Sequence, residues 1–281
     1  MPHNILVTGA TGSVGREVVN LIRTAGVPVR AMSRHPQFRS LPADVEGVAA
    51  DFSSEPSLRA ALTNVDQVFW MIPTGPGAMA LLPPDAFVAL AKEAGVQHVV
   101  LLSALAVEYP QNALGALHAR AEHALATQGL PATVLRPGGF MTNALAWAEA
   151  IRSATVLSLP FADTPAPLID PRDVAAIAAR ALLDRAPEGA VLRLTGPEAL
   201  SPREQTRILA HALGKPIEVR SVPESTARLH MLKTMPAPLV DAIVDLNRRG
   251  AGPVLPTVAD MLGRPARSFA DWTRDHADLF R

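Results

Sequence analysis

The chain has 281 residues, of which 48% are hydrophobic and 19% charged, and its formal net charge at pH 7 is zero. This composition is sufficient for a buried core and excludes an intrinsically disordered chain. The balanced charge, without any basic run, argues against nucleic-acid binding. The absence of cysteine excludes disulfides, thiolate metal sites and cysteine nucleophiles.

No targeting or membrane-spanning segment is apparent in the sequence. The first residues, MPHNILVTGATG, lack a basic segment followed by an apolar run, so we expect no signal peptide. No stretch approaches the ~18 uninterrupted apolar residues of a membrane helix. The histidines are scattered without metal-ligand spacing, so we expect no metal site. We predict a cytoplasmic protein with no membrane partner.

Strands and helices are predicted to alternate in the first half of the chain. A short apolar run at 4–8 predicts a strand buried on both faces, and residues 13–25 predict an amphipathic helix closed by Gly26. The alternation continues with strands at 27–32, 47–50, 66–72, 98–102 and 132–135, and helices at 57–62, 85–94 and 116–128. This pattern predicts an α/β fold with a doubly wound parallel sheet of the Rossmann type.

The pattern loosens after Phe140. We expect helices at 142–151, 171–183 and 202–213, and strands at 155–159, 191–195 and 217–222. Residues 224–281 are predicted to be helical, with breaks at Pro236, Pro238, Gly250–Pro253 and Pro265. No linker divides the chain cleanly. We predict a dinucleotide-binding domain of residues 1–150, intertwined with a smaller substrate-side lobe of residues 151–281.

A glycine-rich turn follows the first predicted strand and opens the first helix. It reads TGATGSVG, with glycines at 9, 12 and 15. The first glycine permits the tight turn, the second lets the backbone approach a pyrophosphate, and the third lets helix and strand pack closely. A pyrophosphate would lie on the free N–H groups at the helix N-terminus. The turn predicts a nicotinamide dinucleotide bound by Gly9, Thr11, Gly12, Ser13, Val14 and Gly15.

The choice of cofactor is read at the end of the second predicted strand. An acidic residue there selects NAD(H), but this sequence reads VRAMSRHP and has no acid until Asp44. Arg34 would meet a 2′-phosphate with a charge-assisted hydrogen bond, and Ser33 could add a hydroxyl. The alternative is that Arg34 is a solvated loop charge. The sequence therefore favours NADP(H) over NAD(H).

Two further loops are predicted to complete the cofactor site. Asp51 and Phe52 follow the third strand, where they would bind the adenine amino group and flank the adenine ring. Pro73 and Thr74 follow the fourth strand and would run beside the ribose and nicotinamide. Both predictions follow from the rule that ligands bind outside the carboxyl ends of parallel strands.

Several further segments carry a resemblance that spans nearly the whole chain. They read ADF at 50–52, LLSAL at 101–105, HARAEHAL from residue 118, VLRPGGFMTN at 134–143, DPRDVA at 170–175 and LTGPEALS at 194–201. Together with TGATGSVG they resemble the short-chain dehydrogenase/reductase superfamily. More narrowly, they are similar to its atypical NmrA-like branch, which includes quinone reductase-like and azoreductase-like proteins.

The sequence departs from that superfamily at the proton-transfer residues. The usual Tyr-x-x-x-Lys pair is absent, because the only tyrosine is Tyr109 and Ala113 stands four residues later. On the expected helix stand His118 and Glu122, one turn apart on the same face. His118 could donate a proton near neutral pH, with Glu122 orienting it or raising its pKa. Alternatively, both residues hold a loop or the nicotinamide ribose.

The resemblance also implies roles for residues after the fifth and sixth strands. Ser103 occupies the position where the superfamily's serine binds the substrate oxygen. We take Ser103, His118 and Glu122 as the candidate catalytic residues, and Ser103 as a candidate cofactor contact as well. The backbone at Pro137, Gly138, Gly139 and Phe140 would pass the nicotinamide, with Phe140 against its ring. Residues that would face the substrate, or else belong to the core, are Phe140, Met141, Asn143 and Trp147.

Three functions fit these features to different degrees. The best supported is an NADPH-dependent reductase that acts on a small apolar carbonyl, quinone or related conjugated substrate. A non-catalytic NAD(P)-binding redox sensor is the alternative that the missing Tyr/Lys pair favours. A sugar-nucleotide epimerase fits less well, because that chemistry usually uses the missing tyrosine. Monomer and homodimer both stay open.

Overall fold

The computed structural model describes residues 4–34, 42, 44–73, 81–109, 111–185, 187–250 and 252–281. The chain forms two compact units that are interleaved along the sequence. Unit 1 comprises Met1–Gln111, Gly115–Arg136 and Val174–Leu192, and unit 2 comprises Asn112–Leu114, Pro137–Asp173 and Arg193–Arg281. The domain boundary that we expected near residue 150 falls inside unit 2.

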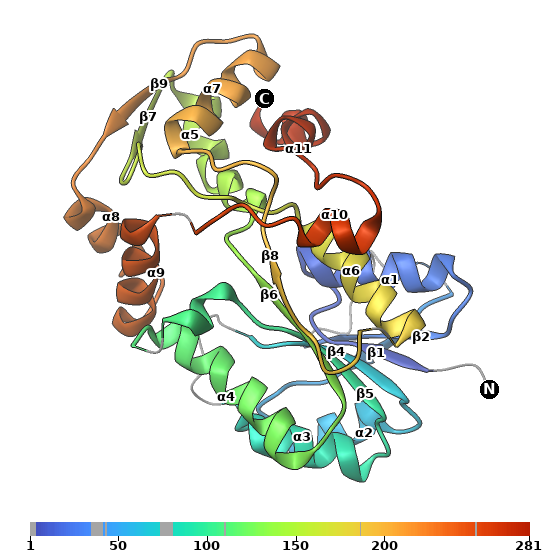
Figure 1. The fold of residues 1–281 in the computed structure, drawn as a ribbon. Helices are drawn as coiled ribbons and strands as arrows, with labels where there is room; N and C mark the ends of the chain where they lie inside the picture. The colour runs from blue at the N-terminus through green and yellow to red at the C-terminus, as the bar shows by residue number, and fades with distance from the viewer. Residues whose placement is uncertain are drawn as a thin grey trace. The chain divides into compact units, whose positions relative to one another are not determined.

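A parallel sheet of seven strands, counted over the described residues, has the order β3-β2-β1-β4-β5-β6-β8 (Figure 1). Its strands are β1 (Ile5–Val7), β2 (Val29–Ser33), β3 (Glu46–Ala49), β4 (Gln67–Met71), β5 (His98–Leu102), β6 (Ala132–Pro137) and β8 (Val191–Leu194). The winding direction reverses between β1 and β4, which is where open sheets of this kind bind ligands. The predicted Rossmann-type fold is confirmed.

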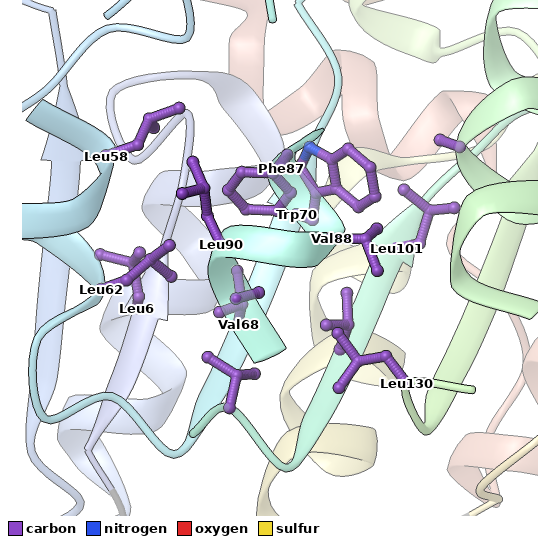
Figure 2. Packing of buried hydrophobic residues seen from close by; sticks show 14 of the residues in the cluster. Leu6, Leu58, Leu62, Val68, Trp70, Phe87, Val88, Leu90, Leu101 and Leu130 are labelled. Carbon is purple, nitrogen blue, oxygen red and sulfur yellow. The ribbon is translucent and has the colours of Figure 1, made fainter. Parts of the chain in front are cut away.

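Helices cover both faces of this sheet. They are α1 (Ser13–Thr24), α2 (Glu55–Leu62), α3 (Pro84–Glu93), α4 (Ala113–Gln128) and α6 (Pro171–Asp184), with a short 3₁₀ turn, η2 (Leu105–Glu108), after β5. Residues from α2, α3 and α4 pack on one face against alternate strand residues, among them Leu6, Val68 and Leu101 (Figure 2). Ile5 and Val7 point to the other face and are also fully buried.

Aromatic side chains fill the centre of that core. The centroid of the Phe87 ring lies 4.6 Å from that of Trp70 (Figure 2). It lies 5.3 Å from the centroid of the Phe52 ring. All three residues are buried. Such tilted contacts add to the stabilisation from burial itself. They brace the carboxyl end of β4 and the loop after β3, two segments of the predicted cofactor site.

Unit 2 contains a second, two-stranded parallel sheet of β7 (Val156–Leu159) and β9 (Glu218–Ser221). Its helices are η3 (Met141–Trp147), α5 (Ala148–Ser153), α7 (Pro202–Leu213), α8 (Glu224–Met231), α9 (Ala237–Arg249), α10 (Thr257–Leu262), α11 (Phe269–His276) and η4 (Ala277–Phe280). The single helix expected at 142–151 is instead the 3₁₀ segment η3 followed by α5. The strands expected near 155–159 and 217–222 exist, but they pair with each other.

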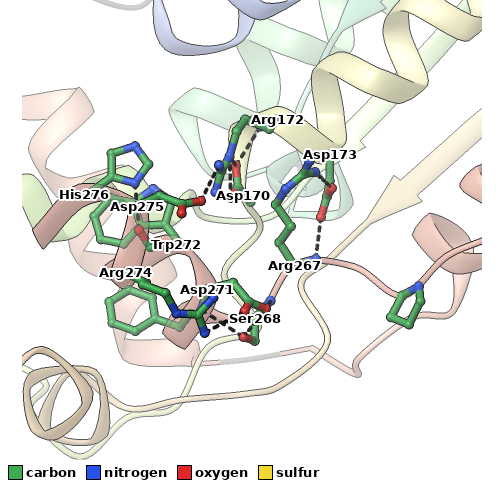
Figure 3. A network of polar contacts seen from close by, with 12 residues as sticks. Asp170, Arg172, Asp173, Arg267, Ser268, Asp271, Trp272, Arg274, Asp275 and His276 are labelled. Carbon is green, nitrogen blue, oxygen red and sulfur yellow. Dashed lines mark hydrogen bonds and ion pairs between the residues drawn. The ribbon is translucent and has the colours of Figure 1, made fainter. Parts of the chain in front are cut away.

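Buried carboxylates tie the start of α6 to the last part of unit 2 (Figure 3). Asp173 is fully buried and accepts hydrogen bonds from Arg264 Nη2 at 2.7 Å, from the Arg267 guanidinium and from the Arg267 backbone N–H at 2.7 Å. Asp170 accepts a bond of 2.6 Å from Arg172, which also reaches Asp275. The contacts of Asp173 with Arg264 and Arg267, and of Arg172 with Asp275, join residues about 90 to 100 positions apart in the sequence.

Candidate cofactor and active site

The glycine-rich turn between β1 and α1 has the backbone geometry that the sequence predicted. Gly9 has a φ of +62°, in the left-handed region that favours glycine. The backbone N–H of Gly12 donates to the Gly9 carbonyl oxygen at 2.9 Å. A Cβ on Gly15 would lie 2.3 Å from the same oxygen, so α1 approaches the turn more closely than any side chain allows. The first and third glycines are therefore required by local geometry.

The N-terminus of α1 has no side-chain cap. Gly12 is its N-cap residue, no side chain of the described residues accepts from the first turn, and that turn contains no acidic residue. The first N–H groups of a helix have no partner within the helix, and they carry the positive end of its dipole. Thr11 and Ser13 are exposed beside them, while Val14 is buried. The turn therefore fits a pyrophosphate, as predicted for a dinucleotide.

Two residues that our sequence prediction missed support this turn from β1 and β4. The Thr8 hydroxyl donates to the Phe69 carbonyl oxygen at 3.1 Å and accepts from the Met71 backbone N–H at 2.8 Å. The Met71 side chain lies over Gly9, since a Cβ added there would come within 2.3 Å of its terminal methyl. A threonine just before the first glycine was the available signal for such a bond.

The end of β2 presents a positive charge where the cofactor's adenosine half is expected. Arg34 is exposed, and Ser33 is partly buried at the last position of the strand. The Arg34 charge is one of the influences on Asp51, whose pKa is lowered mainly by hydrogen bonds from the backbone and side chain of Ser53. Asp51 thus stays ionised beside the predicted adenosine site, with its Oδ1 atom already accepting from Ser53 at 2.8 Å.

The remaining predicted cofactor residues of unit 1 fall into three situations. Phe52 is buried in the core against Phe87, so its ring contributes to packing. Pro73 is partly buried directly after β4. Thr74 lies outside the described residues. A role for Phe52 and Pro73 beside the cofactor stays a prediction.

A compact polar cluster lies where the carboxyl ends of β5 and β6 meet a side chain from α4. Ser103 follows β5 and its hydroxyl donates to Glu122 Oε1 at 2.5 Å. Arg136, near the end of β6, donates two hydrogen bonds to the same carboxylate, from Nε to Oε1 at 3.0 Å and from Nη2 to Oε2 at 2.5 Å. The Glu122 side chain is 13% exposed and that of Arg136 is 21% exposed, so water competes little for these bonds. We call Ser103, Glu122 and Arg136 the Ser–Glu–Arg cluster.

The electrostatics of the Ser–Glu–Arg cluster follow from this pairing. The hydrogen bond to Glu122 raises the pKa of Arg136, against a smaller opposing effect of burial. Forked bonds between guanidinium and carboxylate are directional as well as strong. Both oxygens of Glu122 are therefore held in place, and one of them accepts the Ser103 proton. Ser103 and Glu122 were expected at the site from the sequence, whereas Arg136 was not.

His118 lies on α4 one turn before Glu122 and is buried. Burial lowers the pKa of His118 to about 4, and the Glu122 charge only partly opposes this. Its Nδ1 atom has neither solvent contact nor a hydrogen-bond partner among the described residues. The imidazole is therefore neutral near pH 7, which corrects our expectation that it titrates near neutrality. Glu122 bonds Ser103 and Arg136 instead of His118 Nδ1.

The residues expected around the nicotinamide and substrate belong to unit 2. Phe140 forms an isolated bridge with Ile169, and the backbone N–H of Met141 donates to the Ile169 carbonyl oxygen. Met141 is buried in the unit 2 core, and Trp147 packs against that core. Asn143 is exposed. Met141 and Trp147 thus have packing roles, while contacts of Pro137 to Phe140 and of Asn143 with ligands stay predictions.

Two whole-chain features bear on the kind of protein. No helix within the described ranges is long and apolar enough to span a membrane. Among those same residues, no group of three or more histidine, aspartate or glutamate side chains is placed to hold a metal ion. The fold and the glycine turn define a protein of the Rossmann-type dinucleotide-binding class. Residues 1–249 match the NmrA-like family, and the chain belongs to that family.

Comparison with known proteins gives several relatives of full length. The chain is 40% identical to the (4-alkanoyl-5-oxo-2,5-dihydrofuran-3-yl)methyl phosphate reductase of Streptomyces griseus, over 98% of this chain and 99% of that protein. It is 35% identical to the NAD(P)H azoreductase of Xenophilus azovorans, with the same two coverages. Both of these relatives are named as reductases.

A solved structure of similar fold contains the expected kind of cofactor. The NADPH-dependent quinone oxidoreductase of Escherichia coli, crystallised with NADPH, superposes with a TM-score of 0.83 and 25% sequence identity. The match covers 99% of this chain and 100% of that one. The resemblance that the sequence motifs carried is therefore confirmed at the level of family and fold.

Proposed function

We propose that the protein is an NADPH-dependent reductase that delivers hydride to a small, apolar, conjugated acceptor such as a quinone, an azo compound or an unsaturated carbonyl. The observation that carries this proposal is that the N-terminus of α1 at the glycine turn has no side-chain cap, while Ser103 and His118 offer no acid at pH 7. The full-length relatives named as reductases support it. NADPH, when bound, supplies the hydride.

The residues of unit 1 account for cofactor binding. The free N–H groups at the start of α1 suit the pyrophosphate, and Arg34 suits a 2′-phosphate. Gly12 leaves the backbone open to close approach. Two comparisons support NADP(H) as the cofactor. The quinone oxidoreductase was crystallised with NADPH, and the relative from Xenophilus azovorans is named as an NAD(P)H azoreductase.

The residues around β5 and α4 limit the chemical kinds of hydride acceptor that the site can reduce. Ser103 already donates its proton to Glu122, and His118 is neutral and buried. Neither group can serve as an acid at pH 7. A simple ketone becomes a strongly basic alkoxide on hydride transfer and needs such an acid. A quinone becomes a stabilised hydroquinone anion that solvent can protonate, so conjugated acceptors are favoured.

The test is to mix the protein with NADPH and a panel of acceptors and follow the absorbance of the reduced nicotinamide. The panel pairs quinones and an azo dye with cyclohexanone, a ketone without conjugation. We expect oxidation with the conjugated acceptors and none above the protein-free rate with cyclohexanone. Equal turnover of cyclohexanone would contradict the inference that neither Ser103 nor His118 acts as a proton donor.

One observation also favours a second function. A dinucleotide site in which neither Ser103 nor His118 can act as an acid suits a redox sensor that signals through a partner. Such a sensor would bind NADPH tightly in calorimetry and leave it unoxidised across the whole panel. That result would replace the reductase by the sensor.

A further inference from the structure

Ser103 has an unused hydrogen-bonding capacity of one defined kind. A serine hydroxyl has one proton and two lone pairs. The proton is directed at Glu122, 2.5 Å away, and no donor among the described residues bonds the Ser103 oxygen. The residue is 3% exposed in the protein without ligand. Only the lone pairs of Ser103 are therefore available to a ligand.

The direction of the Ser103 proton is determined by Arg136. Glu122 would be free to rotate if Ser103 were its only partner. The fork of Arg136 holds both of its oxygens and keeps the carboxylate as a pure acceptor, because a guanidinium has only donors. An ionised acceptor at 2.5 Å binds the serine proton more strongly than a neutral ligand carbonyl can.

We propose that Arg136 is a positioning residue, which acts through Glu122 to make Ser103 a hydrogen-bond acceptor for an O–H or N–H group of the bound ligand. The resemblance to dehydrogenases implied a serine that binds a substrate oxygen and left the direction of that hydrogen bond open. The ligand group recognised is a hydroxyl or amide N–H, as offered by the cofactor carboxamide or by the hydroxyl of a reduced product. The inference concerns the site of the proposed function and rests on it for the choice of ligands.

The test uses two pairs of ligands that differ by one donor. NADP⁺ is paired with its acetylpyridine analogue, in which a methyl replaces the carboxamide amino group. Para-methoxyphenol is paired with its methyl ether, both added to the protein loaded with NADP⁺. Affinities are measured by calorimetry for the wild-type protein and for Ser103→Ala. Turnover is not measured, so these affinities can be interpreted even if the protein proves not to be a reductase.

We expect Ser103→Ala to lower the affinity for a ligand that carries the donor by about 3- to 10-fold, which is the range of one hydrogen bond. The affinity for the matched ligand without the donor should not change. Loss of affinity for at least one donor ligand, with its partner unchanged, supports the proposal. Equal losses within both pairs, or no loss for either donor ligand, would overturn it.

Variants of Arg136 separate positioning from simple structural support. Arg136→Met should reduce the preference for the donor ligand about threefold, and Arg136→Lys should restore part of it because the charge remains. The control is Arg59→Met, which removes an exposed arginine paired with Glu55 and Glu93 elsewhere in unit 1. A purely structural Arg136 would lower the melting temperature and leave the preference unchanged, which would refute its positioning role.

Discussion

Arg34 stands exposed at the end of β2, where the identity of the cofactor is decided by single side chains. Replacing it by alanine should weaken NADPH binding by about tenfold, because a charge-assisted hydrogen bond to the 2′-phosphate is lost. NADH has no such phosphate and should bind with little change. Calorimetric titration with both cofactors measures this, and Arg59→Ala is the control for loss of an exposed positive charge. Equal losses for NADPH and NADH would contradict the assignment to NADP(H).

His118 predicts a dependence of stability on pH. Its pKa is about 4 in the folded protein, against about 6.5 in an unfolded chain. Between these values the unfolded state binds the extra proton, so the free energy of unfolding should fall as the pH is lowered from about 6.5 towards 4. His118→Leu should flatten this slope by up to about 1.4 kcal/mol per pH unit. Denaturant unfolding at several pH values measures the slope.

The exposed neighbour His123 provides the control for that measurement. His123→Leu removes an exposed histidine and is measured in the same way for comparison. Buried His98, whose pKa is lowered chiefly by desolvation, contributes a slope of the same sign in every variant. An identical pH slope in the wild type and in His118→Leu would show that His118 is not buried as a neutral group.

The Ser–Glu–Arg cluster shows which site residues a sequence can reveal. Ser103 and Glu122 were accessible through family motifs. Arg136 was visible as a charge directly after buried strand residues, a position where a charged side chain needs a partner. Its partner depends on which helix lies beside β6, and the spacing of 14 residues between Glu122 and Arg136 does not encode that.

At the scale of elements, the close contact between α1 and the glycine turn restricts which residue can occupy position 15. Gly15→Ala would place a methyl group 2.3 Å from the Gly9 carbonyl oxygen, which is backbone and cannot move aside cheaply. We expect a loss of about 1–3 kcal/mol in the free energy of unfolding, and weaker cofactor binding because the turn must shift. Chemical denaturation and calorimetry measure the two effects.

Gly252 offers a matched control for Gly15. A Cβ there meets nothing within 4 Å, so Gly252→Ala should change stability by less than about 0.5 kcal/mol. An equally small effect of Gly15→Ala on stability would contradict the inference that α1 packs too closely against the turn for a side chain at position 15.

Element boundaries were predicted best where periodicity and punctuation agree. Gly26 closes the region of α1, and Ser201 with Glu204 forms a capping box at the start of α7. The segment 142–151 was predicted less well. Its apolar spacing suits a helix, but Met141 and Ala144 are drawn into the core of unit 2 and the first part forms 3₁₀ turns.

At the scale of the whole molecule, Asp173 holds long-range contacts within unit 2. Asp173→Ala would leave the Arg264 and Arg267 guanidinium groups without their shared acceptor. Because both arginines are about one third exposed, water recovers part of the loss, and we expect destabilisation of about 2–3 kcal/mol. The free energy of unfolding from denaturant titration measures it.

An exposed ion pair of unit 2 is the control for that prediction. Asp163 pairs with Arg203 and its side chain is 70% exposed, so Asp163→Ala should destabilise the protein much less than Asp173→Ala does. Comparable effects of the two substitutions would mean that Asp173 is not a buried anchor.

The sequence by itself determined the Rossmann-type sheet, the glycine turn and the family. These features rest on alternation, glycine spacing and charge over a few neighbouring residues, which are local properties. Only the tertiary structure decided that Arg136 holds Glu122, that β7 pairs with β9 and that His118 is neutral. Each of these depends on which distant segments become neighbours and on how much water they exclude, since hydrogen-bond partners and pKa values are set by the surroundings and not by the chain order.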